Sequence, residues 1–257
     1  MTTVVRMELP EPWIAVVTID NPPVNAHSAQ VLEELAKTFD AIADRDDVRV
    51  AILTGAGKIF CAGADIKSRS DRPREAGDHW QTSRVAREAY HSIRECQKPV
   101  IGAINGPALG GGLAFAASCD MLIASERGCL GLPEIDVGLL GGGRHAQRLF
   151  GHSRLRRMML TGYRVFGPEL YRLGVVESCV KPEDLMPAAL ELAREVAAKS
   201  PVAIKLAKHA LNTIEELSLR DGYRFEQTLT GQLSQTEDSK EAMRAFVEKR
   251  KPEFKGR

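Results

Sequence analysis

The sequence predicts an α/β fold in which a largely parallel sheet is followed by a helical C-terminal part. Three observations indicate this class. Residues 48–55 and 99–105 are short runs rich in Val and Ile that end in Gly or Asn, which is typical of buried strands. Segments with helical spacing alternate with such runs, and connections of this length join parallel strands. From about residue 182 onward the pattern is helical.

The first half of the chain contains further elements. Residues 3–9 and 13–19 have the pattern of a strand hairpin, and the sequence DNPP follows the second strand. Ser28 suits the N-cap of a helix whose apolar residues fall on one face, namely Val31, Leu32, Leu35, Phe39 and Ile42. A polar stretch precedes a second helix that ends near Cys96, and residues 120–125 form another strand.

The C-terminal region contains a helix start. Ser200 and Pro201 suit the N-cap and the first helical position, and the next apolar residues at helical spacing are Val202, Leu206, Leu211 and Ile214. The chain ends in a short basic helix and tail. We therefore expect an α/β core over residues 1–195 and a helical region over 196–257 that packs on the core or on a neighbouring subunit.

Composition excludes several classes of protein. Of the 257 residues, 35 are Lys or Arg and 34 are Asp or Glu, so a net charge of +1 argues against a general nucleic-acid binder. The five cysteines lack C-x-x-C spacing and nearby histidines, which predicts reduced thiols in a cytoplasmic protein and no zinc site. No apolar run is long enough to predict a signal peptide or a membrane span.

The stretch ALGGGLAFAASCD, residues 108–120, places three consecutive glycines where a strand ends and a helix begins. The spacing of these glycines, and of TGAGKIF at 54–60, fails both the phosphate-loop and the dinucleotide patterns. Two interpretations remain. An unpaired N–H at the helix start, beside a bare glycine, can bind an oxyanion. Alternatively, the glycines only allow the helix to pack closely on the strand.

Four segments resemble the enoyl-CoA hydratase/isomerase, or crotonase, superfamily. They are FCAGADIKS at 60–68, INGPALGGGLAFAASCD at 104–120, LGLPEIDVGLL at 130–140 and AFVEKRKPEFKGR at 245–257. The resemblance spans the chain and implies a spiral of ββα units followed by a helical trimerisation region. It also implies an acyl-CoA substrate, no cofactor other than the coenzyme A of that substrate, no metal, and a homotrimer or homohexamer.

The resemblance also implies roles for individual residues. The N–H groups of Ala64 and Gly111 match the family's oxyanion hole for the acyl thioester. The loop that meets the adenine of coenzyme A matches Ala62, Asp65, Ile66 and Lys67. Phe246 and Lys249 match positions that contact coenzyme A from a neighbouring subunit, with Lys249 near its phosphates. A cation at this position suits a ligand that carries several phosphate charges.

One departure from the family pattern concerns the two glutamates that hydratases use. The second is present as Glu134, but Ala114 occupies the position of the first. Alanine cannot hold a water molecule or move a proton, whereas one carboxylate beside an oxyanion hole suffices to shift a double bond. The sequence therefore favours isomerisation over hydration. For this role Glu134 must lie in an apolar pocket that raises its pKa, and otherwise it is a surface carboxylate.

Three more residues are candidates near the acyl group. On an extended stretch Asp136 shares a face with Glu134 and can form a split carboxylate pair, or it serves as a cap or surface contact. Arg144 and His145 stand at a helix start, where they can recognise a carboxylate or another oxygen function, or lie on the surface. We expect structural roles for the other histidines, which are His27, His79, His91, His152 and His209.

These observations lead to one function and two alternatives. The first is an acyl-CoA isomerase that uses Glu134 for proton transfer. The second is a hydratase, lyase or ring-opening hydrolase for a cyclic or aromatic-derived acyl-CoA, with Asp136 or His145 supplying the missing group. The third is a non-catalytic homologue that binds acyl-CoA.

Overall fold

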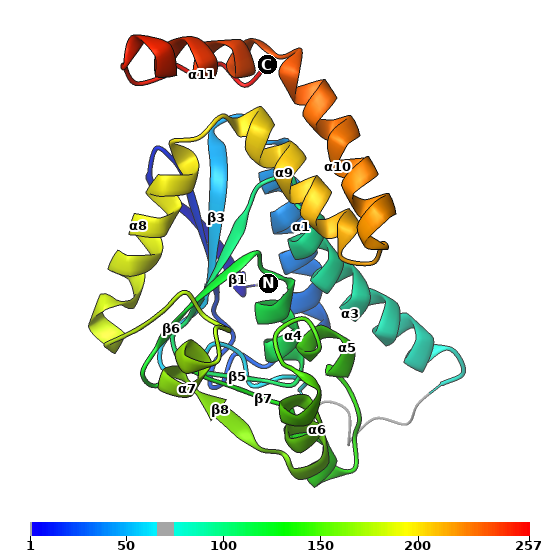
Figure 1. Ribbon diagram of the computed structural model, residues 1–257. Coiled ribbons are helices and arrows are strands. Elements are labelled where there is room, and N and C mark those ends of the chain that lie inside the picture. Colours follow the sequence, from blue (N-terminus) through cyan, green and yellow to red (C-terminus); the bar gives the residue numbers. More distant parts are fainter. Residues whose placement is uncertain (1, 66–74) are drawn as a thin grey trace.

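The computed structural model describes residues 2–65 and 75–257, and it confirms the α/β class (Figure 1). A six-stranded sheet has the order β1-β2-β3-β4-β6-β9. Its strands are Val5–Glu11, Trp13–Ile19, Val48–Gly55, Val100–Ile104, Met121–Ser125 and Ser178–Val180. β1 pairs antiparallel with β2, as the hairpin pattern predicts, and the remaining pairs are parallel.

A second sheet of three strands lies beside the glycine stretch. β5 (Pro107–Leu109) pairs in parallel with β7 (Cys129–Gly131), which pairs antiparallel with β8 (Arg164–Phe166). The sequence did not predict these strands or β9, because a run of three residues is too short to show a periodic pattern. This small sheet orients the segment from which the glycines begin.

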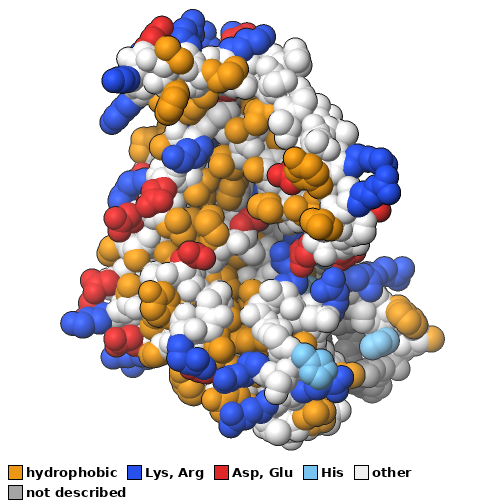
Figure 2. All heavy atoms as spheres, in the orientation of Figure 1, with side chains coloured by type: hydrophobic (Ala, Val, Ile, Leu, Met, Phe, Trp, Pro, Cys, Tyr) orange, Lys and Arg blue, Asp and Glu red, His pale blue; other side chains and the backbone are white. Residues whose placement is uncertain are grey.

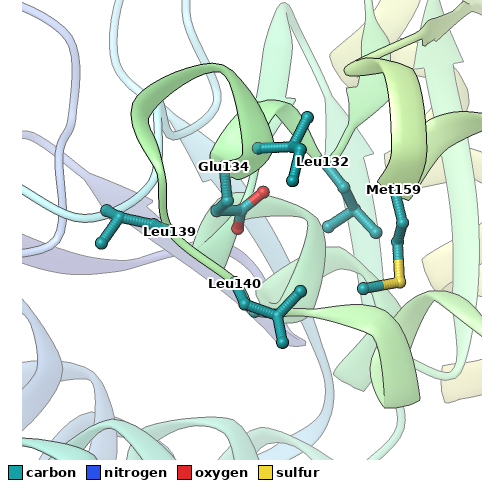
Figure 3. Close-up of a pocket in the computed structure, with 7 residues that line it drawn as sticks. Leu132, Glu134, Leu139, Leu140 and Met159 are labelled. Atoms are coloured by element: carbon teal, nitrogen blue, oxygen red, sulfur yellow. The ribbon is translucent and has the colours of Figure 1, made fainter.

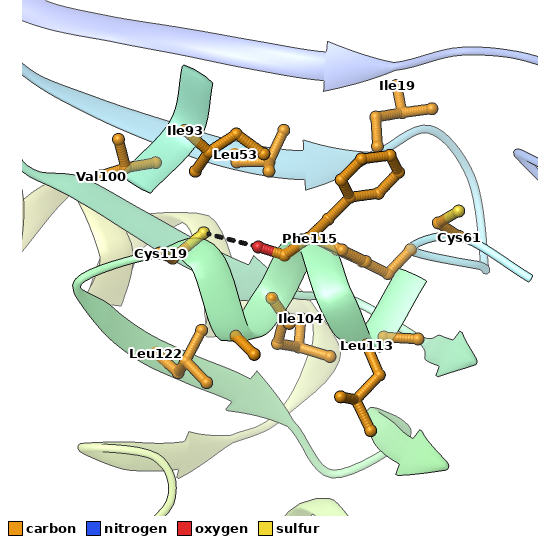
Figure 4. Close-up of a cluster of buried hydrophobic side chains, with 14 of the residues drawn as sticks. Ile19, Leu53, Cys61, Ile93, Val100, Ile104, Leu113, Phe115, Cys119 and Leu122 are labelled. Atoms are coloured by element: carbon orange, nitrogen blue, oxygen red, sulfur yellow. Dashed lines mark hydrogen bonds between the residues drawn. The ribbon is translucent and has the colours of Figure 1, made fainter. Parts of the chain in front are cut away.

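Helices cover both faces of the large sheet. α1 (Ala29–Asp44) and α3 (Asp78–Glu95) lie on one face with α4 (Gly111–Ser118), and α8 (Leu185–Ala197) covers the other. The Ser28 hydroxyl accepts a hydrogen bond from the Val31 N–H at 3.3 Å, and the predicted apolar face of α1 is buried. Figure 4 shows Phe115 of α4 within the cluster of buried hydrophobic side chains between the sheet and the helices α1 and α3. The expected burial of a parallel sheet on both faces is confirmed.

Short helices and the C-terminal helices complete the fold. Their bounds are η1 Pro133–Val137, α5 Gly143–Ala146, α6 His152–Thr161, α7 Gly167–Arg172, η2 Pro182–Asp184, α9 Pro201–Ile214, α10 Leu219–Ser234 and α11 Glu237–Glu248. The boundary predicted between residues 195 and 196 falls within α8, and the division into two regions stays a prediction. Among the described residues, no helix combines the length and apolar character needed to cross a membrane.

Helix α9 starts as predicted but is packed differently. The Ser200 hydroxyl accepts the Ala203 N–H at 3.2 Å. The expected apolar face is wrong at Leu211, which is 65% exposed, whereas Lys208 of the same helix is buried. The Lys208 ammonium lies 2.8 Å from Asp120 Oδ2 and donates to the Lys98 carbonyl at 3.0 Å. An ion pair between the buried Lys208 and the partly buried Asp120, which hydrophobic spacing cannot reveal, therefore joins α9 to the core.

Replacing Lys208 with Met should destabilise the protein by about 2 kcal/mol, because the partly buried Asp120 carboxylate then loses its cation. Urea unfolding of both variants measures the effect against Lys205→Met, which changes an exposed lysine of the same helix. An equal loss of stability in the two variants would contradict the structural role of the ion pair.

Candidate active site

The glycine junction is formed by close contacts with three separate segments. A Cβ on Gly110 would lie 2.6 Å from Glu134 Oε1, and Gly110 also has a positive φ of 55°. A Cβ on Gly111 would lie 2.1 Å from His27 Nε2. A Cβ on Gly112 would lie 2.1 Å from the backbone carbonyl oxygen of Cys61. Close packing therefore explains Gly112, while the other two glycines adjoin polar side chains.

The loop that carries Ala64 lies alongside this junction. The Leu109 N–H donates to the Cys61 carbonyl at 2.9 Å, and the His27 N–H donates to the Gly63 carbonyl at 2.8 Å. Ala64 and Gly111 both line one groove of about 1330 Å³. Among the described residues, neither of their N–H groups donates a backbone hydrogen bond. The structure thus brings the two predicted oxyanion donors to one groove.

Glu134 lies on η1, whose turn begins at Pro133. Figure 3 shows its carboxylate among the side chains of Leu132, Leu139, Leu140 and Met159. The side chain is half-buried, and Oε2 has no hydrogen-bond partner among the described residues. Burial raises the pKa of Glu134, and a hydrogen bond from its own backbone opposes this effect. Glu134 therefore meets the condition of an apolar pocket and a raised pKa.

Asp136 does not share a face with Glu134, which corrects the sequence prediction. The segment is a 3-10 helix and not an extended strand, because Pro133 favours the first turn of a helix. Residues two apart then differ by about two thirds of a turn. Asp136 lines the groove and is exposed, and its carboxylate lies against Gly162, where a Cβ would be 2.7 Å from Oδ2.

Arg144 and His145 begin α5 but occupy different surroundings. Arg144 is exposed, pairs with Glu216 at 3.2 Å and is outside the groove lining. His145 lines the groove. Burial lowers the pKa of His145, and the neighbouring His91 and three arginines lower it further, so its ring is largely neutral at pH 7. Of the two, only His145 is placed to meet a ligand in this groove.

Three residues that line the groove have no functional role in the prediction from sequence: His27, Tyr90 and Arg164. His27 was assigned a structural role, and no local pattern distinguishes it. Tyr90 lies three residues before the buried Ile93 on α3, and this spacing could have indicated that it faces inward. Arg164 lies on β8, a strand too short to be predicted, so no signal marked its position.

The predicted coenzyme A contacts are only partly described. Ala62 and Asp65 line the groove, while Ile66 and Lys67 lie outside the described residues. Phe246 and Lys249 do not line it: Phe246 is on α11, Lys249 follows that helix, and both are exposed at the end of the molecule away from α5 (Figure 1). Within the described ranges, no group of three or more metal-ligating side chains could hold a metal ion.

The arrangement of sheets, helices and groove defines an enzyme of the crotonase fold. The sequence pattern of the family described as Enoyl-CoA hydratase/isomerase matches residues 11–257. The chain belongs to this family, whose members act on acyl-CoA thioesters.

Individual relatives support this assignment over nearly the whole chain. A short-chain-enoyl-CoA hydratase of Clostridium acetobutylicum is 37% identical over 95% of both chains. A (7aS)-7a-methyl-1,5-dioxo-2,3,5,6,7,7a-hexahydro-1H-indene-carboxyl-CoA hydrolase of Mycobacterium tuberculosis is also 37% identical, over 93% of this chain and 97% of its own. The crystal structure of a Bacillus anthracis enoyl-CoA hydratase has a TM-score of 0.93 at 32% identity, covering 99% of this chain and 100% of its own.

Glu134→Gln should be more stable than the wild type at pH 7, and this gain should shrink as the pH falls toward the ordinary carboxyl pKa of 4.5 and be absent well below it. The folded state holds the Glu134 proton more tightly than the unfolded chain, so the wild type loses stability as the pH rises past that value. Urea unfolding at several pH values measures the difference.

Glu183→Gln is the matched control, because Glu183 also follows a proline at the start of a 3-10 helix but is exposed. If the stability gain of Glu134→Gln does not vary with pH, the carboxyl group is not held in the environment described above.

Proposed function

We propose that this enzyme moves the double bond of a 3-enoyl-CoA to the 2-position. The observation on which the proposal rests is the pairing of Ala114 with Glu134. Ala114 faces the groove with a methyl group where hydratases of the family have their first glutamate. The Glu134 carboxylate lies against the glycine junction, 2.6 Å from the Cβ position of Gly110. One carboxylate beside oxyanion donors is sufficient for this reaction.

The proposed reaction has two proton transfers. Glu134 removes a proton from C2 of the substrate, and the electron pair moves toward the thioester oxygen. The N–H groups of Ala64 and Gly111 stabilise the negative charge on that oxygen, aided by the dipole of α4. The protonated Glu134 then returns the proton at C4, and the double bond forms between C2 and C3. No cofactor is needed beyond the coenzyme A of the substrate.

The surroundings of Glu134 support both transfers. A base with a raised pKa removes a proton more readily than an ordinary carboxylate, provided that it is ionised at the working pH. The buried Leu132 and the partly buried Met159 cover the inner side of the carboxyl group, which limits competing proton exchange there. Oε2 is buried and has no hydrogen-bond partner among the described residues, which favours the protonated form of the carboxyl group, while Oε1 lies toward Gly110 at the glycine junction.

Hydrolysis of a cyclic acyl-CoA is a second candidate. The 37% identical Mycobacterium tuberculosis relative is named as a hydrolase of a dioxo-indene-carboxyl-CoA. In this chain His145 lines the groove and is largely neutral at pH 7, so it can accept a proton from a water molecule. Hydration of an enoyl-CoA, which the name of the Clostridium relative states for that protein, would require the same substitute for the first glutamate.

We also propose assembly into a homotrimer or homohexamer. Large apolar side chains on α10 and α11 are exposed in the single chain, among them Leu219 at 91% and Phe246 at 86%. Exposure on this scale favours contact with another subunit. In such an assembly Phe246 and Lys249 would reach the coenzyme A of a neighbouring subunit.

Glu134→Gln should lower kcat for a 3-enoyl-CoA by about 1000-fold, because the amide cannot accept the C2 proton. The absorbance of the conjugated product measures the rate. Glu183→Gln is the matched control and should retain the wild-type rate. Unchanged turnover in Glu134→Gln, or no turnover of any 3-enoyl-CoA by the wild type, would sink the proposed function.

Ala114→Glu should raise hydration of a 2-enoyl-CoA about tenfold or more, because it restores the first of the two glutamates that hydratases of the family use. Ala114→Gln provides a side chain of the same size without the charge. The decrease in absorbance of the conjugated 2-enoyl-CoA substrate gives the rate for each variant. Equal hydration by the two variants would show that a carboxylate at this position does not decide between the reactions.

A further inference from the structure

Tyr90 enters the groove from α3 and is held there by rings from two other helices. Its ring centroid lies 5.1 Å from that of Phe115 on α4, with an interplanar angle of 57°. The ring centroid of His145 on α5 lies 5.0 Å from that of Tyr90, and the two rings meet edge to face at an interplanar angle of 64°. Such contacts between aromatic rings restrict the direction of the side chain. The phenol is therefore held in one direction by side chains of two other helices.

The hydroxyl group of Tyr90 lies at the glycine junction. It is 2.8 Å from the position that a Cβ on Gly111 would occupy, and His27 Nε2 is 2.1 Å from the same position. Any side chain at residue 111 would displace both polar atoms. A bare Cα at this position thus allows the Tyr90 hydroxyl to lie against the backbone of Gly111, which lines the groove.

A phenol suits this position chemically. In the proposed reaction the negative charge develops on the thioester oxygen, near the Gly111 N–H. A Tyr hydroxyl can donate a hydrogen bond to such an oxygen without losing its proton at neutral pH. Ketosteroid isomerase, an unrelated double-bond isomerase, combines one carboxylate base with a Tyr donor for the same purpose. His145 is largely neutral at pH 7, so it does not place a full positive charge beside the phenol.

We propose that Tyr90 is a third hydrogen-bond donor to the thioester oxygen, together with the N–H groups of Ala64 and Gly111. This inference rests on the proposed function, because it requires an enolate in this groove. The phenol keeps its proton throughout. Glu134 takes the C2 proton, the electron pair moves onto the thioester oxygen, and the three donors share the charge that results.

Tyr90→Phe tests the proposal, since the substitution retains the ring contacts and removes only the hydroxyl. We expect kcat for a 3-enoyl-CoA to fall about 100-fold with little change in KM. The exchange of C2 hydrogens of butyryl-CoA in D2O, followed by NMR, reports enolate formation alone and should slow by the same factor. Tyr171→Phe, which alters an exposed tyrosine outside the groove, should change neither rate.

The two readouts separate this inference from the proposed function. If the wild type exchanges C2 hydrogens without isomerising a 3-enoyl-CoA, the proposed function fails, and slowed exchange in Tyr90→Phe still supports the donor role. Unchanged exchange in Tyr90→Phe overturns it, as does a wild type that shows no exchange. If Tyr90→Phe slows the reaction only of acyl-CoAs that carry an oxygen substituent on the acyl chain, the donor role is also overturned. The hydroxyl would then serve substrate recognition.

Discussion

The rest of this structure depends on the backbone of residues 110–112 remaining bare. Each of the three glycines has a polar group within 2.6 Å of the position that a Cβ would occupy. These groups are the Glu134 carboxylate, the His27 ring and the backbone carbonyl of Cys61. Atoms at such distances leave no room for a side chain. The groove can therefore bring a carboxylate, a phenol and backbone N–H groups close together, which larger residues at the junction would keep apart.

Both ends of α4 are held in place by contacts with distant segments. At its N-terminal end, the Gly110 N–H donates to the Gly131 carbonyl of β7 at 2.9 Å. Beyond its C-terminal end, Asp120 Oδ2 accepts the Val100 N–H at 2.7 Å and pairs with the buried Lys208. The C-terminal helices and the glycine junction are thus linked through one short helix. Preorganised donors of this kind need a rigid support.

The position of Glu134 in the groove lowers the stability of the folded protein and raises the reactivity of its carboxyl group. Glu134 Oε2 has no hydrogen-bond partner within residues 2–65 and 75–257 and lies beside apolar side chains, which destabilises the folded protein. The same environment raises the pKa of the carboxyl group and favours proton transfer to and from carbon. Such local violations of packing rules are expected at functional sites, and the well-packed clusters on both faces of the large sheet compensate for them.

The sequence alone determined the long strands, helix α1, the cap at Ser200 and, through resemblance to a family, the positions of Ala64, Gly111 and Glu134. Periodicity and local caps encode the elements, because they involve residues close in the chain. Tertiary structure decided the small sheet β5-β7-β8, the face of Asp136 and the burial of Lys208. The tertiary structure alone also placed Tyr90 and His27 at Gly111. These contacts join segments far apart in the sequence, and local sequence patterns do not encode such contacts.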